Sequence, residues 1–385
     1  MVPNLRFSSF TDLFRLYTLK DVLQRVSIPV NVEENKLYYQ IGIRSHSKGI
    51  FHKEAETGKQ IGNKRIFWIE PNCLILNIVF AWEQAVAKTS EKEVGMVASH
   101  RFPMYKVLNN SLDYIVDFFK TEKGKQLLQM ASPGGAGRNK TLNQDFFLNS
   151  KIYLPSLNEQ LKTSNLIELI EDRIETQIKI IDDCLSYRNA IVDYFFESLS
   201  SNWRQVKLSN ILKEYSELHV KDNSIIHATL SKEGIYPKTD RYDRDFLVKD
   251  EEKKYKVSHL NDICYNPANL KFGVITRNTF GDCIISPIYI TFTINNNCLP
   301  KFIELLVTRK QFITQARKYE QGTVYERMAV NSSDLLSMNV LIPSLSIQQK
   351  IVDIVDTIDN KITNEKELLN LYKTQKDYLL KNMFI

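Results

Sequence analysis

The sequence lacks the features that mark membrane proteins and disulfide-bonded secreted proteins. No uninterrupted apolar run of about 18 residues is present, which excludes a transmembrane helix. The N-terminus shows no basic region followed by an apolar core, so we expect no signal peptide. The five cysteines are scattered and never spaced as CxxC, which favours free thiols over a disulfide frame or a zinc site. We therefore expect a protein of a reducing cytoplasm.

A recognisable catalytic set is missing as well. The nearest pattern is Tyr265-Asn266-Pro267-Ala268-Asn269, which lacks the second proline and the aromatic residue by which adenine methyltransferases hold a flipped base. No glycine-rich loop follows a strand, and no clustered Asp…Glu-x-Lys set stands out. We predict no catalytic residues, no metal site and no cofactor bound by this chain. The alternative, a self-contained methyltransferase or nuclease, would require tight binding of S-adenosylmethionine or a metal.

Positive charge is unevenly distributed along the chain. The net charge is +6, yet residues 157–200 hold 4 basic and 9 acidic residues, and residues 346–385 hold 6 of each. Residues 1–156 hold 21 basic and 14 acidic residues, and residues 201–345 hold 20 and 16. A polyanion would therefore meet these two larger segments. The alternative is an ordinary solvated surface with a chance excess of lysine.

The most informative feature is an internal repeat with an offset of 188 residues. Residues 142–196 align with residues 330–384 without a gap, and a shorter likeness relates the regions near residues 17 and 206. The aligned pairs include Asn143 with Asn331, Pro155-Ser156-Leu157 with Pro343-Ser344-Leu345, Gln160 with Gln348, Ile170 with Ile358, and Phe196 with Phe384. A period this long indicates a duplicated half-protein rather than a solenoid.

Each copy predicts a short strand ending at proline and then a long helix. Proline closes a strand because it cannot donate to the ladder, and Asn158 or Ser346 follows as a candidate N-cap. Apolar residues then recur every three or four positions without internal proline or glycine, over roughly 40 residues or about 60 Å. The expected helix-pairing residues are Ile170, Ile174, Ile178, Ile181 and Leu185 in the first helix, and Ile358, Ile362, Leu369, Tyr372 and Leu379 in the second. The alternative is two unrelated amphipathic helices, each packed on its own domain.

Two segments, one before the first helix and one between the two helices, contain short β-rich runs that alternate with turn residues. Each segment also has a helical stretch, at residues 111–130 and 300–318, followed by a loop with basic residues. We predict mixed α/β domains at residues 1–150 and 201–340, separated by strand-and-helix regions at 151–200 and 341–385. The fold class is α+β.

Several motifs in these segments resemble the specificity subunits of type I restriction-modification systems. They are DICYNPANLKFG…GDCIISPIYITF, LNIVFAWEQAVA…VGMVASHRFPMY, the opening VPNLRFSSFTD, and the LPSL or IPSL end of the strand before each long helix. The resemblance covers essentially the whole chain. One departure is Ile347-Gln348-Gln349, where the family usually shows a Glu-Gln pair that Glu159-Gln160 keeps.

The resemblance implies a non-catalytic reader of double-stranded DNA in a bacterial cytoplasm. Two target-recognition domains in a pseudo-twofold arrangement would each read one half of a split sequence. Two long antiparallel helices would form a coiled coil that sets the spacer. Two modification subunits, which use S-adenosylmethionine to methylate adenine, would dock on this chain. Restriction subunits, which use ATP and Mg, would join them. A coiled-coil scaffold without DNA binding is the alternative.

Base edges are read by Arg, Lys, Asn or Gln, and phosphates are held by Lys, Arg, Ser, Thr and Tyr. We therefore take polar residues in turn-rich loops as candidates for DNA binding. In the first domain these are Arg44, Ser45, His46, Lys48, Trp82, Ser99, His100, Arg101, Arg138 and Lys140. In the second they are Ser231, Lys232, Tyr236, Lys238, Asn266, Asn269, Lys271, Arg277, Tyr325 and Arg327. For His46 and His100 a buried structural role is an equal alternative, and for Trp82 a place in the core.

Overall fold

The computed structural model describes residues 2–134, 140–220, 224–238, 254–321 and 328–385. The chain forms two compact units. Unit 1 comprises Met1–Lys179 and Lys366–Ile385, and unit 2 comprises Ile180–Glu365. Each unit therefore holds one globular domain together with part of both long helices.

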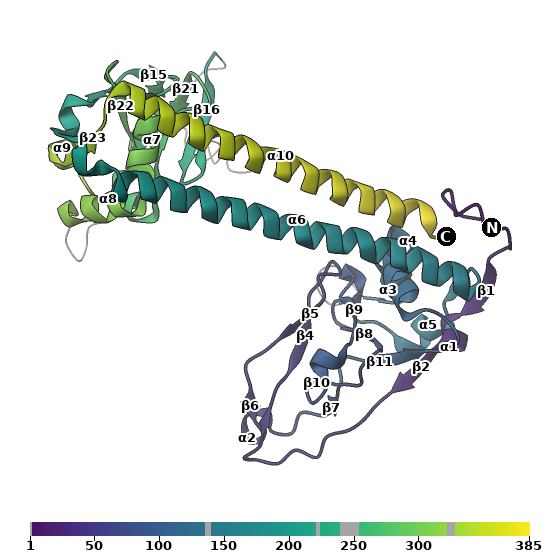
Figure 1. Ribbon diagram of the computed structural model, residues 1–385. Coiled ribbons are helices and arrows are strands. Elements are labelled where there is room, and N and C mark those ends of the chain that lie inside the picture. The colour runs from purple at the N-terminus through teal and green to yellow at the C-terminus, as the bar shows by residue number, and fades with distance from the viewer. Residues whose placement is uncertain (1, 135–139, 221–223, 239–253, 322–327) are drawn as a thin grey trace. The chain divides into compact units, whose positions relative to one another are not determined.

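The two long helices are α6 (Leu157–Ser198, 42 residues) and α10 (Leu345–Met383, 39 residues). Figure 1 shows both as continuous helices. Each begins two residues after the proline that closes a strand, and neither contains an internal proline or glycine, the residues that most often break a helix. The predicted strand and long helix are confirmed in both copies, but the candidate N-caps Asn158 and Ser346 are wrong, because the helices begin at Leu157 and Leu345.

Within unit 1, the start of α6 packs against the end of α10. Ile167 and Ile170 share one buried cluster with Leu379, Leu380, Met383 and Phe384. Glu171, which follows Ile170 on α6, lies 2.6 Å from Lys376, which precedes the clustered residues of α10. Because residue numbers rise along α6 as they fall along the facing part of α10, the two helices are antiparallel here.

Within unit 2, the end of α6 packs against the start of α10. Val192 and Phe196 share a cluster with Ile351, Val352 and Val355, and Arg188 binds Asp359. The two interhelical ion pairs are related by the repeat, since 171 + 188 = 359 and 188 + 188 = 376. The duplication is therefore visible in the contacts as well as in the sequence.

Both globular domains contain the same four-stranded antiparallel sheet. In unit 1 its order is β2-β11-β8-β9, and in unit 2 it is β14-β22-β19-β20. The strands of unit 1 are β2 (Leu23–Val26), β11 (Met104–Val107), β8 (Leu74–Leu76) and β9 (Val86–Lys88). Those of unit 2 are β14 (Leu212–Tyr215), β22 (Ile290–Ile294), β19 (Ile263–Tyr265) and β20 (Ile275–Arg277).

A two-stranded antiparallel sheet joins each domain to the start of a long helix. In unit 1 it pairs β1 (Arg15–Thr18) with β12 (Lys151–Leu154), and in unit 2 it pairs β13 (Arg204–Lys207) with β23 (Asn339–Ile342). The register is the same in both, because Arg15 lies opposite Leu154 and Arg204 lies opposite Ile342.

The remaining strands differ between the domains. Unit 1 has three two-stranded sheets: β3 (Leu37–Tyr38) with β6 (Glu56–Thr57), β4 (Ile41–Ile43) with β5 (Ile50–His52), and β7 (Ile66–Trp68) with β10 (Val97–Ser99). Unit 2 has one five-stranded sheet of β15 (Leu218–Val220), β18 (Lys254–Ser258), β21 (Cys283–Ile285), β16 (Ile226–Ser231) and β17 (Gly234–Pro237). The shared frame thus carries two different sets of loops.

Short helices complete each frame. In unit 1 they are α1 (Leu19–Val22), α2 (Gly58–Ile61), η1 (Ala81–Glu83), η2 (Glu91–Glu93), α3 (Leu112–Lys120), α4 (Glu122–Met130) and α5 (Gln144–Asn149). In unit 2 they are η3 (Ser200–Asn202), η4 (Leu208–Asn210), η6 (Pro267–Phe272), α7 (Pro300–Thr308), α8 (Lys310–Ala316), η7 (Arg317–Tyr319) and α9 (Ser332–Ser337). The helices α3, α4 and α5 of unit 1 match α7, α8 and α9 of unit 2 in position.

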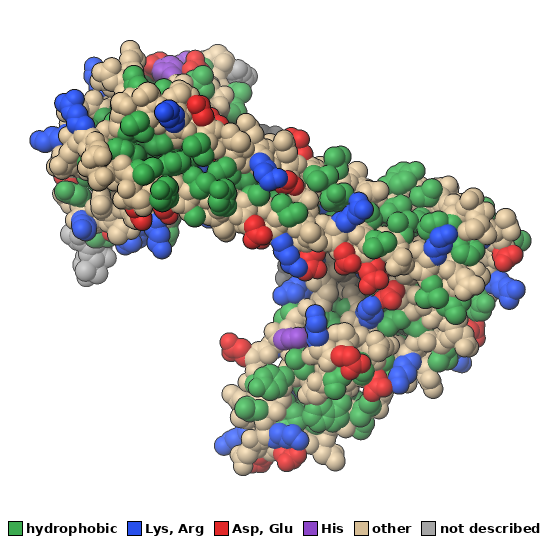
Figure 2. All heavy atoms as spheres, viewed as in Figure 1, with side chains coloured by type: hydrophobic (Ala, Val, Ile, Leu, Met, Phe, Trp, Pro, Cys, Tyr) green, Lys and Arg blue, Asp and Glu red, His purple; other side chains and the backbone are tan. Residues whose placement is uncertain are grey.

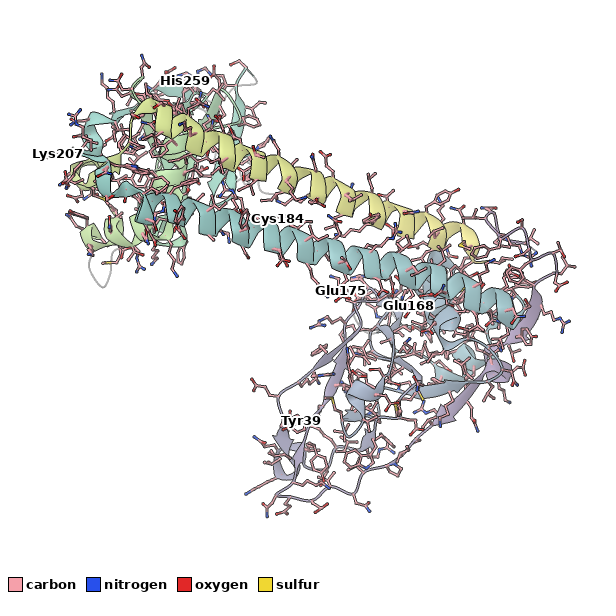
Figure 3. All side chains as sticks on the ribbon, in the orientation of Figure 1. Tyr39, Glu168, Glu175, Cys184, Lys207 and His259 are labelled. Atoms are coloured by element: carbon pink, nitrogen blue, oxygen red, sulfur yellow. The ribbon has the colours of Figure 1, made fainter. Side chains whose placement is uncertain are left out.

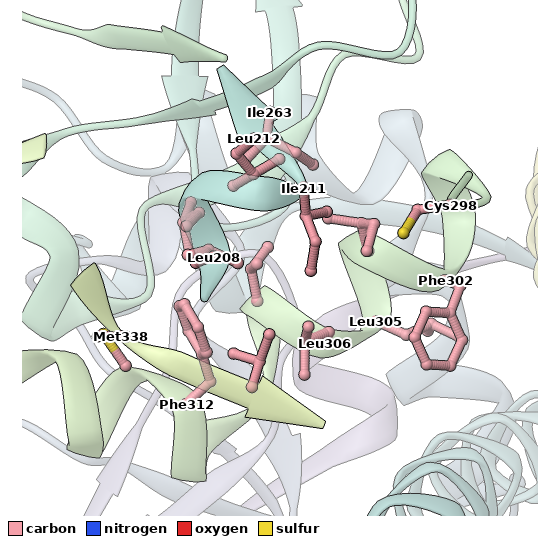
Figure 4. Packing of buried hydrophobic residues seen from close by; sticks show 14 of the residues in the cluster. Leu208, Ile211, Leu212, Ile263, Cys298, Phe302, Leu305, Leu306, Phe312 and Met338 are labelled. Atoms are coloured by element: carbon pink, nitrogen blue, oxygen red, sulfur yellow. The ribbon is translucent and has the colours of Figure 1, made fainter. Parts of the chain in front are cut away.

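The largest buried cluster of each unit joins its four-stranded sheet to its long helices. In unit 2, Phe302 and Leu306 of α7 pack with Leu208, Ile211 and Leu212 (Figure 4). Phe196 of α6 stacks on Phe302 with ring centroids 5.2 Å apart. Apolar residues at the helical period on α7 therefore anchor the domain to the long helix.

The expected fold class is confirmed: two mixed α/β domains accompany two long helices. The expected helix-pairing set needs a correction at two positions, because Ile178 and Leu185 are 41% and 37% exposed. The neighbouring Gln177 and Cys184 are buried and partly buried instead. The buried or partly buried positions 163, 167, 170, 174, 177, 181 and 184 alternate spacings of four and three. This heptad stripe includes Gln177 and Cys184, each one residue before the apolar residue that the sequence favoured.

Candidate nucleic-acid interface

In the first domain, the segment between β8 and β9 organises the candidate residues. Residues 77–84 run from Asn77, whose Oδ1 accepts the Val79 N–H at 3.1 Å, through η1 to Gln84. Gln84 has a left-handed backbone, and its Nε2 donates to the carbonyls of Phe119 and Lys120 at 2.9 and 3.0 Å. This segment is therefore fixed to the end of α3.

The tip of the β4–β5 hairpin is bonded to this segment. The backbone N–H groups of His46 and Ser47 donate to the carbonyls of Glu83 and Gln84 at 2.7 and 2.9 Å, and Ser45 Oγ donates to Glu83 Oε2 at 2.9 Å. Arg44 stacks over the Phe51 ring at 4.9 Å. The exposed side chains of Arg44, His46 and Lys48 are thus held on a rigid turn.

Two further stretches meet the same segment. The Ile78 N–H donates to the Arg101 carbonyl at 3.0 Å, which brings the turn at residues 99–101 to it. Lys140 Nζ lies 5.1 Å over the ring of Trp82, whose Nε1 donates to the Val79 carbonyl. Trp82 is partly buried, and both His46 and His100 are exposed, so neither histidine is a core residue. The structure therefore gathers the described candidates of this domain around residues 77–84.

The second domain has the same arrangement at residues 266–273. Asn266 Oδ1 accepts the Ala268 N–H at 3.1 Å, η6 follows, and Gly273 ends it with φ +82°. The β16–β17 hairpin reaches this segment, since a Cβ placed on Gly273 would lie 3.9 Å from Lys232 Cβ. Asn77 matches Asn266, and Gln84 matches Gly273, each with an offset of 189.

Two candidates of the second domain are engaged in holding the domain together. Asn266 is buried, and its side chain caps η6. Arg277 donates from Nε to Glu304 of α7 at 2.9 Å and from Nη1 to Asn261 Oδ1 at 2.7 Å. Reading a base would require either side chain to give up these bonds, so the structure assigns both a structural place that the sequence did not reveal.

The other candidates of this domain lie nearer the surface. Lys232 and Lys271 are exposed, Asn269 is partly exposed, and Lys271 Nζ lies 5.1 Å over the Phe272 ring. Ser231 Oγ bonds Glu233 at 2.8 Å, and Tyr236 OH donates to the Glu233 carbonyl at 3.1 Å. The Lys238 N–H donates to the His227 carbonyl, so Lys238 continues from β17 beside β16. Arg138, Tyr325 and Arg327 lie outside the described residues.

Some exposed residues in or beside these segments were not among the DNA-binding candidates chosen from the sequence. Phe272 is 65% exposed next to Lys271, and an aromatic ring beside lysine is suited to stacking. Arg65 is exposed, and its carbonyl accepts the His100 N–H, which places it beside the turn at 99–101. The adjacent pair Lys64-Arg65 was a readable basic signal, whereas the exposure of Phe272 was not.

A cavity of about 400 Å³ lies behind the β4–β5 hairpin, toward α3 and α6. Its charged lining residues are Lys48, Lys88, Asp113, Asp117, Lys120, Glu168 and Glu171. Lys120 lies 2.8 Å from Asp117 and 2.9 Å from Glu171, and burial raises the pKa of Asp117 to about 6. Figure 3 shows Glu168 on α6 above this domain. Lys88 and Lys120 of this lining are paired with acids, whereas Lys48 belongs to the exposed hairpin tip.

Acidic and basic side chains lie side by side on the visible faces of both units (Figure 2). Among the described residues, no group of three or more His, Cys, Asp or Glu side chains is placed to hold a metal ion. None of the helices in the described ranges has the length and apolarity needed to cross a membrane. All five cysteines are free.

Comparison with known proteins identifies the domain type. Residues 251–372 match the family model of the type I restriction modification DNA specificity domain. Comparison with curated proteins finds no match. The resemblance seen in the sequence motifs is thereby confirmed for residues 251–372, which hold the larger part of the second domain and the adjoining part of α10.

Solved structures share the fold over nearly the whole chain. The HsdS subunit from Thermoanaerobacter tengcongensis has a TM-score of 0.51 at 14% identity, with 96% of each chain covered. The type I restriction-modification S subunit from M. genitalium has a TM-score of 0.56 at 14% identity, covering 100% of this chain and 99% of that one. A chain from a study of complex assembly and conformational transition of the type I R-M system has a TM-score of 0.63 at 13% identity, covering 96% and 97%.

Proposed function

From the premise that this chain carries a type I restriction-modification DNA specificity domain within the fold of a specificity subunit, we propose that each of its two globular domains reads one half of a bipartite DNA target. The long helices would set the spacer between the halves. Two modification subunits would dock on the chain and methylate adenine with S-adenosylmethionine, and restriction subunits that use ATP and Mg would join them. The chain itself would contribute recognition rather than catalysis, in a bacterial cytoplasm.

The observation that carries this proposal is the pairing of a common frame with different loops. The four-stranded sheets have the same order, and residues 77–84 and 266–273 occupy equivalent places in them. The hairpins that meet these segments differ, with Arg44, His46 and Lys48 in one and Lys232 in the other. A DNA target with two different halves requires two recognition domains that share a fold but present different side chains.

The test is to co-express this chain with its modification subunit in a host without DNA methylation and to map N6-methyladenine. We expect a two-part motif with an unspecified spacer, absent when this chain is omitted. Exchange of residues 17–140 for those of a related chain should change one half of the motif and leave the other. Methylation that is independent of this chain in an assembled complex would overturn the proposal.

DNA binding by the purified chain separates the reader from a coiled-coil scaffold. Phosphate contacts release counterions, so affinity for DNA should fall steeply as salt concentration rises. A scaffold would show no preference for the mapped motif over a scrambled duplex of equal length and composition.

A further inference from the structure

Two cavities occupy repeat-equivalent positions, one in each unit. The first, of about 440 Å³, lies between β1, the loop before α3 and the start of α6. The second, of about 520 Å³, lies between β13, the loop before α7 and the start of α10. The matching lining residues are Arg15 with Arg204, Asn109 with Asn297, and Pro155-Ser156-Leu157 with Pro343-Ser344-Leu345.

The cavities share a matched pair of arginines, Arg15 and Arg204. Arg15 and Arg204 are both exposed, and within the described parts of the chain neither side chain makes a hydrogen bond or an ion pair. By contrast, Arg188 and Arg277 are engaged by acids of their own unit. An unpaired arginine at the same place in both units is suited to a ligand that binds in two copies, one at each unit.

The matched leucines are also unexplained by the fold. Identity between the two copies is concentrated in Pro-Ser-Leu-x-x-Gln-x-Lys, at residues 155–162 and 343–350. Internal hydrogen bonds account for the proline and the glutamine, because each glutamine bonds its proline carbonyl. Leu157 and Leu345, however, are each 45% exposed at the rim of a cavity. Keeping an exposed leucine at both positions suits a surface that becomes buried in a complex.

We infer that these two cavities are a duplicated docking site, and that each takes a short segment with an acidic side chain beside an apolar one from a copy of the same partner protein. The guanidinium of Arg15 or Arg204 would pair with the carboxylate, and Leu157 or Leu345 would cover the apolar residue. The amides of Asn109 and Asn297 are placed at the same wall to bond the segment's backbone. This inference rests on the proposed function, which supplies a partner present in two copies, the modification subunit.

Protein fits these cavities better than DNA. Burying an exposed leucine gains about 25 cal/mol per Å² of apolar surface, a gain that a phosphate backbone does not offer. The basic hairpins with Lys48 and Lys232 line neither cavity, so DNA reading and partner docking fall on different surfaces.

The experiment is to measure the stoichiometry of the full-length chain with its modification subunit by native mass spectrometry. The variants are R15E, R204E and the double variant. Matched controls are K151E and K207E, which reverse an exposed charge on the opposite face of the same two-stranded sheets. Figure 3 labels Lys207 at the outer side of unit 2. Binding to DNA is measured in parallel on every variant.

We expect two modification subunits on the parent chain and on both controls, one on either single variant, and none on the double variant. Affinity at the altered site should fall on the order of tenfold or more. Retention of two subunits by the double variant would overturn the inference, and with DNA binding intact it would leave the proposed function standing. Loss of DNA binding with two subunits retained would assign the cavities to DNA instead. No modification subunit on the parent chain would overturn both proposals.

Discussion

Gln160 and Gln348, one residue of each repeat, make the same hydrogen bonds in the two units. Gln160 Oε1 accepts the Ser111 N–H at 2.9 Å, and its Nε2 donates to the Pro155 carbonyl at 3.0 Å. Gln348 Oε1 accepts the Leu299 N–H at 2.9 Å, and its Nε2 donates to the Pro343 carbonyl at 3.0 Å. Ser111 and Leu299 are the N-caps of α3 and α7, so each glutamine ties a domain helix to the start of a long helix.

Replacing either glutamine by alanine should loosen its own domain. Both side chains are 1% exposed, so Q160A or Q348A would leave a buried N–H and a buried carbonyl unpaired, at a cost of about 2–4 kcal/mol. Hydrogen exchange should quicken at the start of α3 in Q160A and at the start of α7 in Q348A. The control is Q349A, because exposed Gln349 donates to Asp353 one turn away in the same helix. Equal exchange in parent and variants would refute a clamping role.

Glu171 and Asp359 provide a second repeat-related pair with a shared task. Each binds a base of the opposite long helix and a lysine of its own domain: Glu171 binds Lys376 and Lys120, and Asp359 binds Arg188 and Lys301. Burial alone would raise the pKa of Asp359, but Arg188 and Lys301 together hold it below its ordinary value. The carboxylate is therefore stabilised by its neighbours.

The variant D359N should destabilise unit 2 by about 1–3 kcal/mol, since it leaves partly buried Arg188 without its carboxylate and Lys301 with Glu304 alone. E171Q should cost less, because Glu171 is more exposed than Asp359. Because the folded-state pKa of Asp359 is lowered, its contribution is complete above about pH 4 and is lost as the pH falls further. Denaturant unfolding at pH 7 and pH 3 checks this, with exposed Asp353→Asn as the control. If D359N lost the same unfolding free energy relative to the parent at pH 7 and at pH 3, the lowered pKa of Asp359 would be contradicted.

Asp117 predicts the opposite pH dependence. Burial raises its pKa to about 6, against the attraction of Lys120, so between about pH 4 and 6 the folded chain binds more protons than the unfolded chain. Stability from this group therefore falls as the pH rises through that window. Compared with the parent, D117N should gain up to about 2–3 kcal/mol of relative stability from pH 4 to pH 7. Melting temperatures across this range test it, and a constant difference between the two proteins would exclude a raised pKa.

The repeat explains why so much of the frame was predictable. Two copies at a fixed offset act as an alignment within one chain, so the strand ending in Pro155 or Pro343 and the helix after it could be placed twice. Burial along the helices was harder to predict. Ile178 and Leu185 look more apolar than Gln177 and Cys184, but position on the heptad stripe, not apolarity, decides which side chain faces inward.

The candidate sites were less predictable because the hydrogen-bond partners of a side chain depend on the tertiary structure. Asn266 and Arg277 have the chemistry of base readers, yet one caps η6 and the other binds Glu304, which lies 27 residues further along the chain. No local pattern distinguishes a loop asparagine that caps its own backbone from one that faces a groove. The boundaries predicted at residues 150, 200 and 340 follow elements, whereas the compact units divide both long helices between them. DNA contact by any candidate stays a prediction.

In the second domain, candidate DNA-contacting lysines can be compared with a candidate that is bonded inside the domain. Exposed Lys271 lies in the segment at residues 266–273, and exposed Lys232 lies beside it. K232A and K271A should therefore each weaken binding to all DNA sequences and lower the salt slope by about 1 if they contact phosphates. Neither change should alter the free energy of unfolding by more than about 0.5 kcal/mol.

The matched variant is R277A, which breaks the bonds to Glu304 and Asn261 inside the same domain. It should lower the stability of unit 2 by about 1–3 kcal/mol, while the salt slope of the folded fraction stays unchanged. Titration of duplex DNA at several salt concentrations, together with thermal unfolding, separates the two classes. If R277A lowered the salt slope and K232A with K271A did not, the DNA-facing surface would lie on the α7 side of the domain, and the hairpin would serve another role.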